Sequence, residues 1–231
     1  MPAAYYVSTF SATAEFLLTV GRLKKCIILH LTMDQLSQIR DILHTVTVLS
    51  DSEWEAFKDR LIMQEFEKDE HLCREGQTEN YIYFIESGAC RSYFLKDGRE
   101  YTLDFFFSSE FVTSYTSFLT REPSQVNIQA LVKTKTFKIH YNSLQSLYDQ
   151  YHHGERVGRV IAEKQFIKRS RKEMELLSLT AEDRYRSLFK KNPALVGQIS
   201  VKHLSSYLGI HPESLSRIRN KIAVNVKRKS E

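Results

Sequence analysis

The chain has 231 residues, 42% of them apolar, with 33 Lys and Arg against 28 Asp and Glu. Only eight Gly and four Pro occur, and with this ordinary apolar content they exclude collagen-like and disordered proteins. Three cysteines (Cys26, Cys73 and Cys90) are too few for a disulfide scaffold, a four-cysteine zinc site or an iron–sulfur cluster. They indicate a reducing, cytoplasmic compartment.

The net charge of +5 is distributed unevenly along the chain. Residues 151–231 carry 18 Lys and Arg against 8 Asp and Glu, a net of +10, whereas residues 1–150 carry 15 against 20, a net of −5. This asymmetry predicts that the basic part binds a polyanion. The alternative at this point is a basic helix surface that is merely solvated.

The first 32 residues differ from the rest. Their apolar runs, 14–20 and 26–31, are shorter than the roughly 18 residues that a membrane span needs. Basic residues follow the first run instead of preceding it, which is the reverse of a signal peptide. We therefore expect residues 1–32 to be an extension outside the native protein, with Met33 as the biological start.

Two helices are predicted next, the first from Met33 and the second after Ser50, which forms a capping-box pattern with Glu53. Their expected buried side chains are Leu36, Ile39 and Leu43, then Trp54, Phe57 and Leu61.

Residues 62–140 predict short strands separated by turns, and Asp97-Gly98 is typical of a two-residue hairpin. The expected strands are 81–85, 90–95, 101–107, 126–132 and 136–139, which together indicate a small antiparallel barrel or roll.

From Asn142 to Leu179 the pattern predicts one long helix. Lys164 and Arg171 interrupt its apolar stripe, which consists of Val157, Val160, Ile161, Ile167, Met174 and Leu177. Such an imperfect heptad pattern favours a dimer seam, and the alternative is a helix that packs on its own roll. Pro193 then predicts a loop before the last helices.

The last helices give the clearest local signal. Ser200 is a plausible N-cap for a helix of about eight residues, Gly209 ends it, and Pro212 fits the first turn of the next helix. Val201, Leu204 and Leu208 share one face of the first helix, and Leu215, Ile218 and Ile222 share one face of the second. Two short helices joined by a tight glycine turn predict a helix-turn-helix.

The second helix has a polar stripe suited to reading base edges. Arg217 can donate twice to guanine, Glu213 can accept from the cytosine amino group, and Ser216 can do either. Phosphate contacts are expected from Lys202, Ser214, Arg219 and Lys221 and from the tail 227–229. Double-stranded DNA is therefore the predicted polyanion.

Here the sequence resembles a known family. Glu213-Ser214-Leu215-Ser216-Arg217 is similar to the E-x-x-S-R recognition motif of the Crp/Fnr transcription regulators, and residues 75–88 resemble the first glycine-turn segment of their β-roll. The resemblance covers roughly residues 34–223. It implies an α+β fold, with an antiparallel β-roll of the cyclic-nucleotide-binding type, a long dimerisation helix and a small helix-turn-helix domain.

The resemblance also implies organisation and partners. We expect the extension at 1–32, a sensor domain at 33–149, the dimerisation helix at 150–179 and the DNA-binding domain at 180–231. The implied protein is a homodimer on a pseudo-palindromic DNA site, with half-sites about one turn apart. Glu213, Ser216 and Arg217 would contact bases, and RNA polymerase is a further implied partner.

The sensor part departs from members that bind cyclic AMP. Thr113-Ser114 stands where they have Gly-Glu, and Ser124-Gln125 stands where they have Arg-Ser. A buried cyclic phosphate would lose its main charge-assisted bond without that arginine, which argues against cyclic AMP as the effector. The expected effector pocket comprises Glu110, Thr113, Ser114, Arg121, Ser124 and Gln125.

No cofactor or metal is expected, and the iron–sulfur cysteine cluster of some family members is missing from this sequence. His71 and His140 lie far apart without the spacing of a cupin metal site, so an enzyme is not expected. A haem or another small molecule is the alternative ligand of the roll. The remaining alternative is a ligand-binding regulatory module that acts through protein contacts, without specific DNA binding.

Overall fold

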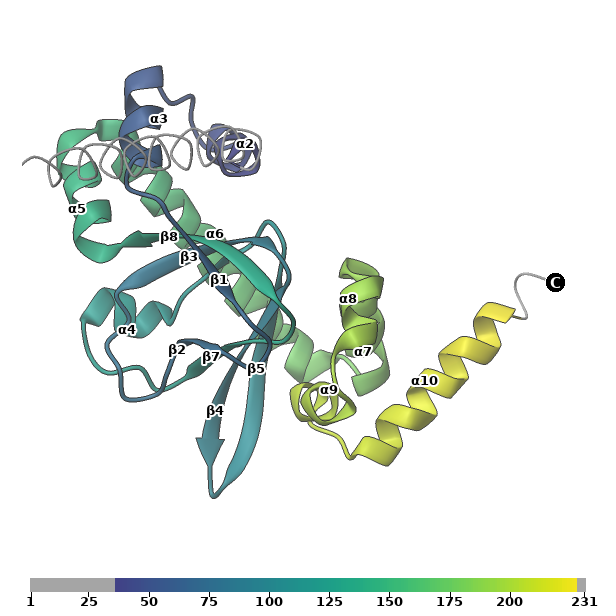
Figure 1. Ribbon diagram of the computed structural model, residues 1–231. Helices are drawn as coiled ribbons and strands as arrows, with labels where there is room; N and C mark the ends of the chain where they lie inside the picture. The colour runs from purple at the N-terminus through teal and green to yellow at the C-terminus, as the bar shows by residue number, and fades with distance from the viewer. Residues whose placement is uncertain (1–35, 228–231) are drawn as a thin grey trace, which may run out of the picture. The chain divides into compact units, whose positions relative to one another are not determined.

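The computed structural model describes residues 36–227, and the expected extension at 1–32 lies outside them. The chain divides into two units after residue 45, so that the described residues 36–45 belong to the first and 46–227 to the second. In the first unit, the helix α2 (Ser37–His44) forms with Ile39 and Leu43 buried, as the stripe predicts. All other elements belong to the second unit (Figure 1).

The second unit begins with α3 (Asp51–Lys58). The predicted capping box is present, because Ser50 Oγ accepts from the amide of Glu53 and the Glu53 carboxylate accepts from the amide of Ser50. Trp54 is buried on this helix, and Phe57 and Leu61 pack against the neighbouring core. Because both cap bonds join residues three apart, the local sequence determines where this helix begins.

Eight strands form two four-stranded antiparallel sheets. One sheet has the order β1-β8-β3-β6 and the other β2-β7-β4-β5. The strands are β1 (Ile62–Phe66), β2 (His71–Cys73), β3 (Tyr81–Ser87), β4 (Ala89–Lys96), β5 (Arg99–Phe107), β6 (Phe111–Val112), β7 (Asn127–Ala130) and β8 (Thr134–His140). The five expected strands are confirmed in position. The short strands β1, β2 and β6 were not predicted.

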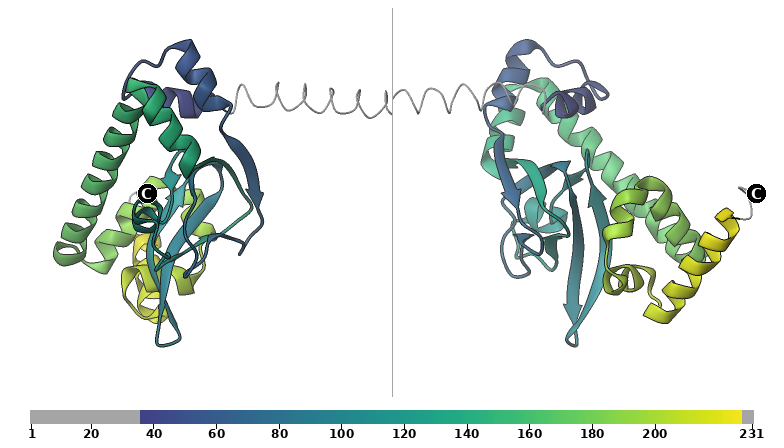
Figure 2. Two further views of the ribbon diagram at one scale, coloured as in Figure 1. Left: turned by 90° about the vertical axis from the view of Figure 1, so that its left-hand side faces the viewer. Right: turned by 45° about the vertical axis from the view of Figure 1, so that its right-hand side comes forward.

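The β4–β5 hairpin projects beyond the rest of its sheet (Figure 2). Its turn has positive φ at both Asp97 (52°) and Gly98 (72°), as a type I′ turn requires. The strand β5 lies at the edge of its sheet, so one side of its backbone is free of strand partners. Between β6 and β7 the chain forms the short helix α4 (Tyr115–Thr120).

Two helices follow the roll, α5 (Tyr141–Gln150) and α6 (His152–Ser178). The single helix expected over 142–179 is therefore wrong, because the backbone is extended at Tyr151 (φ −133°, ψ 118°). Gly158 allows the close return of α6, since a Cβ there would lie 2.3 Å from the Tyr148 hydroxyl oxygen. Leu147 and Tyr148 thus pack directly against the first turns of α6.

The chain ends in α7 (Ala181–Lys191), α8 (Pro193–Gln198), α9 (Val201–Leu208) and α10 (Pro212–Lys227). Pro193 opens α8 instead of lying in a loop, because proline is accommodated in a first helical turn. The apolar core of this region is continuous with the roll. It joins Ala89, Phe105, Phe107 and Leu131 to Tyr185, Leu188, Val196, Ile199, Leu204, Leu208 and Leu215.

Candidate nucleic-acid interface and sensor site

The helices α9 and α10 form the predicted helix-turn-helix. Ser200 Oγ accepts from the amide of His203 at the start of α9. Gly209 ends α9 in the left-handed conformation, with φ 66° and ψ 33°. Leu204, Leu208 and Leu215 are fully buried and hold the two helices together.

The predicted base-reading residues lie on the exposed side of α10. The side chains of Glu213, Ser216 and Arg217 are exposed, whereas Leu215 between them is fully buried. Ser216 also donates to the carbonyl of Pro212, at 3.3 Å. This arrangement leaves an arginine, a carboxylate and a hydroxyl on a helix surface that base edges can approach.

The predicted phosphate-binding residues differ in how far their side chains are already paired or buried. Lys221 pairs with Glu182 of α7 at 2.7 Å, and the Arg219 guanidinium lies 5.9 Å from the centre of the Tyr185 ring. Lys202 pairs with Glu100 of β5, also at 2.7 Å. Ser214 is half-buried, and of the tail only residue 227 lies within the described range. Two of the expected phosphate ligands therefore bind carboxylates of the same chain.

The helix α6 carries an exposed apolar face. Phe166 is 74% exposed, Met174 64% and Leu177 87%, and Ile167 is 48% exposed. Ala162, Glu163, Phe166 and Ile167 line a shallow depression on this face. The opposite face packs on the roll, where Lys172 pairs with Asp104 at 2.9 Å. Packing on the roll thus accounts for one face of this helix, and the dimer seam stays a prediction for the exposed face.

In the roll, some of the residues expected to form an effector pocket come together. Ser114 and Ser124 are buried and share a hydrogen bond of 2.7 Å between their hydroxyl oxygens. Thr113 donates to the carbonyl of Tyr81 at 2.9 Å. Glu110 lies outside this cluster, where it pairs with Lys168 of α6 at 3.5 Å, and Gln125 is exposed.

The Arg121 side chain is engaged in hydrogen bonds within the protein. Its guanidinium donates to the carbonyls of Glu79 (2.8 Å) and Phe118 (3.0 Å) and to the side chain of Asn80. It also lies 4.2 Å from the centre of the Tyr141 ring. In this conformation the guanidinium is committed to holding the loop before β3 against α4.

A buried carboxylate that the sequence did not predict lies beside these serines. Glu79 is 3% exposed, its Oε1 accepts from the amide of Tyr81 at 2.9 Å, and its own amide donates to Ser117 at 3.0 Å. Burial raises the pKa of the Glu79 carboxyl, even though backbone hydrogen bonds lower it. Burial likewise raises the pKa of the neighbouring Cys73 thiol to about 12. Only the density of Ser and Thr over 113–124 could have indicated a polar interior here.

The two histidines considered as ligands have protein partners. His71 Nε2 lies 3.0 Å from the Tyr93 hydroxyl, and His140 Nδ1 accepts from the amide of Asn142 at the start of α5. Among residues 36–227 no group of three or more His, Cys, Asp or Glu side chains is arranged to hold a metal ion.

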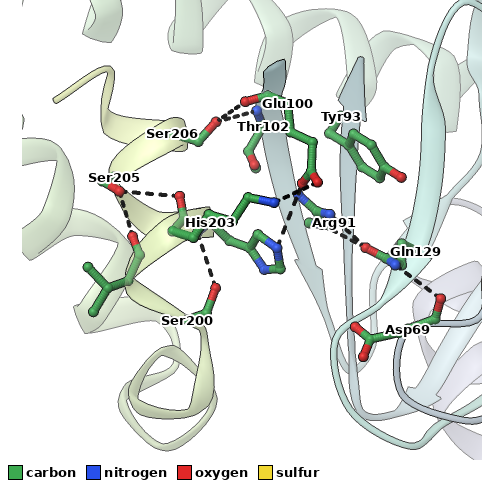
Figure 3. A network of polar contacts seen from close by, with 12 residues as sticks. Asp69, Arg91, Tyr93, Glu100, Thr102, Gln129, Ser200, His203, Ser205 and Ser206 are labelled. Carbon is green, nitrogen blue, oxygen red and sulfur yellow. Dashed lines mark hydrogen bonds and ion pairs between the residues drawn. The ribbon is translucent and has the colours of Figure 1, made fainter. Parts of the chain in front are cut away.

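A polar network joins the roll to α9 (Figure 3). Arg91 is 2% exposed, donates twice to Gln129 Oε1 (3.0 and 2.7 Å) and pairs with Glu100 at 2.7 Å. Burial and the nearby Arg91 charge lower the pKa of His203 to about 4, so this ring is neutral at pH 7. The negative charge of Glu100 is therefore balanced by Arg91 and Lys202. Partial burial acts to raise the pKa of the Glu100 carboxyl, but the hydrogen bonds from Lys202 and Arg91 outweigh burial and lower that pKa.

Comparison with known families identifies the roll. Residues 63–151 match the model of the cyclic nucleotide-binding domain. The chain contains a cyclic nucleotide-binding domain. A search of curated proteins finds no match.

Solved structures extend this similarity to the helices. FixK2 from Bradyrhizobium japonicum is 21% identical, with a TM-score of 0.61 over 71% of this chain and 85% of its own. CLP, a c-di-GMP-responsive global regulator of Xanthomonas campestris, is 20% identical, with a TM-score of 0.58 over 76% and 93%. A regulator assigned to the Crp/Fnr family from Eubacterium rectale is 20% identical, with a TM-score of 0.61 over 77% and 85%. The Crp/Fnr fold predicted from the sequence is thus confirmed.

None of the helices described in the structure is long and apolar enough to cross a lipid bilayer.

Proposed function

We propose that this protein is a transcription regulator that binds a specific DNA sequence as a homodimer, and that it is not an enzyme. The observation that carries the proposal is the exposed stripe of Glu213, Ser216 and Arg217 on a helix whose other face is locked by Leu215. In a helix-turn-helix this second helix enters the major groove. A cytoplasmic location agrees with the buried free thiols of Cys73 and Cys90.

The roles within the stripe follow from its chemistry. Arg217 would donate to the two acceptors of a guanine, and Glu213 would accept from a cytosine amino group. Lys202, Ser214, Arg219 and Lys221 would contact phosphates, which fix position without reading sequence. The net charge of +10 on residues 151–231 supports this division, because it draws the phosphate backbone to the helical part.

The exposed face of α6 supports the homodimer. Val160, Ile167, Met174 and Leu177 follow the spacing of a heptad seam, and three of them are among the exposed large apolar side chains. Two copies of α6 would bury these side chains against each other. The resulting two-fold axis would require half-sites about one DNA turn apart.

The buried cluster of the roll supports an effector other than cyclic AMP. A cyclic phosphate near Ser114 and Ser124 would meet the buried Glu79 carboxyl, which repels it in the ionised form. Arg121 would have to leave its two carbonyl acceptors to offset that charge. The cluster is therefore better suited to a neutral ligand, or to none, than to a phosphate.

Binding to duplex DNA as a function of salt tests the proposal. A random-sequence duplex library would first be selected on the purified full chain, and the affinity of the selected duplex would then be measured at several salt concentrations. We expect the logarithm of the association constant to fall linearly with the logarithm of salt, by about 0.9 per phosphate contacted. Failure to retard any duplex at low salt would reject DNA binding in favour of a module that acts through protein contacts.

The dimer is tested separately. Replacing Ile167 by Glu would place a charge in the proposed seam, so sedimentation should show a shift toward monomer. The variant should still fold and unfold cooperatively, because Ile167 is 48% exposed in the single chain. If the variant still dimerises, Ile167 does not lie in the interface. If the wild-type chain is itself a monomer, the homodimer is rejected.

A further inference from the structure

The helix α9 covers the free edge of β5 through one hydroxyl group. Ser206 Oγ accepts from the amide of Thr102 at 2.9 Å and donates to the carbonyl of Glu100 at 2.8 Å (Figure 3). These are backbone groups that an additional strand would otherwise satisfy. A single side chain of the helix-turn-helix thus takes the place of a strand partner on the sensor roll.

A second contact lies one helical turn before the first. Lys202 precedes Ser206 by four residues, so both lie on the same face of α9. The Lys202 ammonium pairs with Glu100 Oε1 at 2.7 Å, while the other oxygen of that carboxylate pairs with Arg91. Lys202 is 68% exposed and Arg91 only 2%. Glu100 is therefore held by a buried cation of the roll and offers its free oxygen to the helix.

Apolar contacts complete this docked arrangement. The rings of Phe105 in β5 and Tyr207 in α9 lie 5.1 Å apart, and Leu204 and Leu208 share a buried cluster with Phe105. The helix α9 is thus attached to β5 by a hydrophobic contact, an ion pair and a bridging hydroxyl.

We propose that Glu100 and Ser206 form a latch that opposes DNA binding, with the Glu100 carboxylate occupying the Lys202 ammonium in place of a DNA phosphate. The inference rests on the proposed function, in which Lys202 contacts the DNA backbone. A phosphate brought to Lys202 in the docked state would lie next to the Glu100 carboxylate, and these like charges repel each other. DNA therefore binds the state in which α9 has left β5, and docking lowers the apparent affinity by reducing the population of that state.

The first test compares DNA affinity among variants of the full chain. Ser206→Ala removes both hydrogen bonds of the bridge without changing any charge. We expect DNA binding to tighten at least about fivefold, the equivalent of one typical hydrogen bond. Glu100→Gln should tighten it by about tenfold or more, because it removes the competing charge. Glu65→Gln is the matched control, since Glu65 lies on β1 and pairs with Lys133 and Lys135, and it should leave the affinity within twofold.

A double-substitution cycle separates competition from general repulsion. If Glu100 acts by occupying Lys202, the gain from Glu100→Gln should largely disappear when Lys202 has been replaced by Gln. An equal gain in both backgrounds would mean that Glu100 merely adds negative charge near DNA, and would overturn the latch. Ser206→Ala keeps the proposal testable if Glu100→Gln unfolds the roll by leaving Arg91 unpaired.

Hydrogen exchange tests the latch directly. The Thr102 amide donates to Ser206, so its exchange in the wild-type chain reports whether α9 is docked. We expect protection without DNA and faster exchange when the selected duplex is bound. Protection that persists in the DNA complex, or unchanged affinity in Ser206→Ala, overturns the latch while leaving DNA binding intact. If no variant binds any duplex, the proposed function fails, and the latch fails with it.

Discussion

The β-roll and the helix α10 use polar side chains in opposite ways. In the roll, Ser114 and Ser124 bond to each other and Glu79 is buried behind them. On α10, Glu213, Ser216 and Arg217 are exposed. Polar groups that satisfy one another define a rigid interior, whereas exposed donors and acceptors can bind an external partner. The resemblance in fold therefore indicates less about what the roll would bind than about what α10 would bind.

The two regions nevertheless share one hydrophobic core, and the largest expected effect tests this connection. Leu215→Ala removes a fully buried side chain from the cluster that includes Phe105 and Phe107 of β5. We expect a loss of about 2–5 kcal/mol in the free energy of unfolding. Because Trp54 is the only tryptophan, its fluorescence should report unfolding at the same lowered urea concentration as the helix signal.

Two separate transitions, with the Trp54 transition unchanged, would show that the helical part unfolds independently of the roll. Leu119→Ala is a matched control, because Leu119 is 55% exposed in α4 and its loss should matter little.

The next prediction concerns the external partner. Arg217→Ala should cost about 1–3 kcal/mol on the selected duplex and relax the preference at one base pair. Lys221→Ala should weaken all duplexes about equally and lower the salt slope by about 1. Titrations of the selected and of random duplexes distinguish the two. An equal loss on both duplexes for Arg217→Ala would show that Arg217 contacts only phosphate.

The third prediction addresses the buried carboxyl of the roll. Since the pKa of Glu79 is raised in the folded state, the folded protein binds more protons than the unfolded chain above the ordinary value of 4.5. Glu79 therefore makes the wild-type chain lose stability as the pH rises from that value through the raised pKa.

Glu79→Gln removes this titration, so the variant should gain stability relative to wild type as the pH rises from acidic to neutral. Urea unfolding at several pH values measures the difference. If the difference in stability stays constant with pH, the Glu79 pKa is the same in the folded and the unfolded chain. The contrast between a buried polar cluster in the roll and an exposed one on α10 would then be rejected.

The smallest effects compare one turn in each region. Gly209 after α9 and Gly98 in the β4–β5 hairpin both have positive φ, and an added Cβ would meet nothing within 4 Å at either position. Substitution by Ala should therefore cost only backbone strain, about 1 kcal/mol at each site. Thermal unfolding of Gly209→Ala and Gly98→Ala should give similar shifts, and a much larger loss at one glycine would point to a contact absent from this structure.

The sequence predicted those parts of the molecule that depend on neighbours in the chain. The cap at Ser200, the turn at Gly209 and the hairpin at Asp97 are set by residues within a few positions, so their geometry could be anticipated. The break at Tyr151 could not, because the helical periodicity continues across it and only packing against Tyr148 favours the bend.

The candidate sites likewise divide into features set by local sequence and contacts between distant residues. The exposed stripe of α10 follows from helical periodicity. The pairing of Lys202 with Glu100 joins residues that are 102 positions apart, and the place of Glu79 depends on how β3 meets α4. No local pattern encodes such contacts. They arise where the sheet edge and the loops come together.

The edge of β5 has a consequence for the solubility of the protein. This nine-residue strand is the longest in the roll, and the groups that cover its outer edge come from helices later in the chain, namely Ser206 of α9 and Lys172 of α6. A chain that is truncated before these helices, or is still being synthesised, would present an uncovered strand to its neighbours. Such strands pair between molecules and lead to aggregation. The helices proposed to bind DNA and to form the dimer would thus also keep the roll from self-associating.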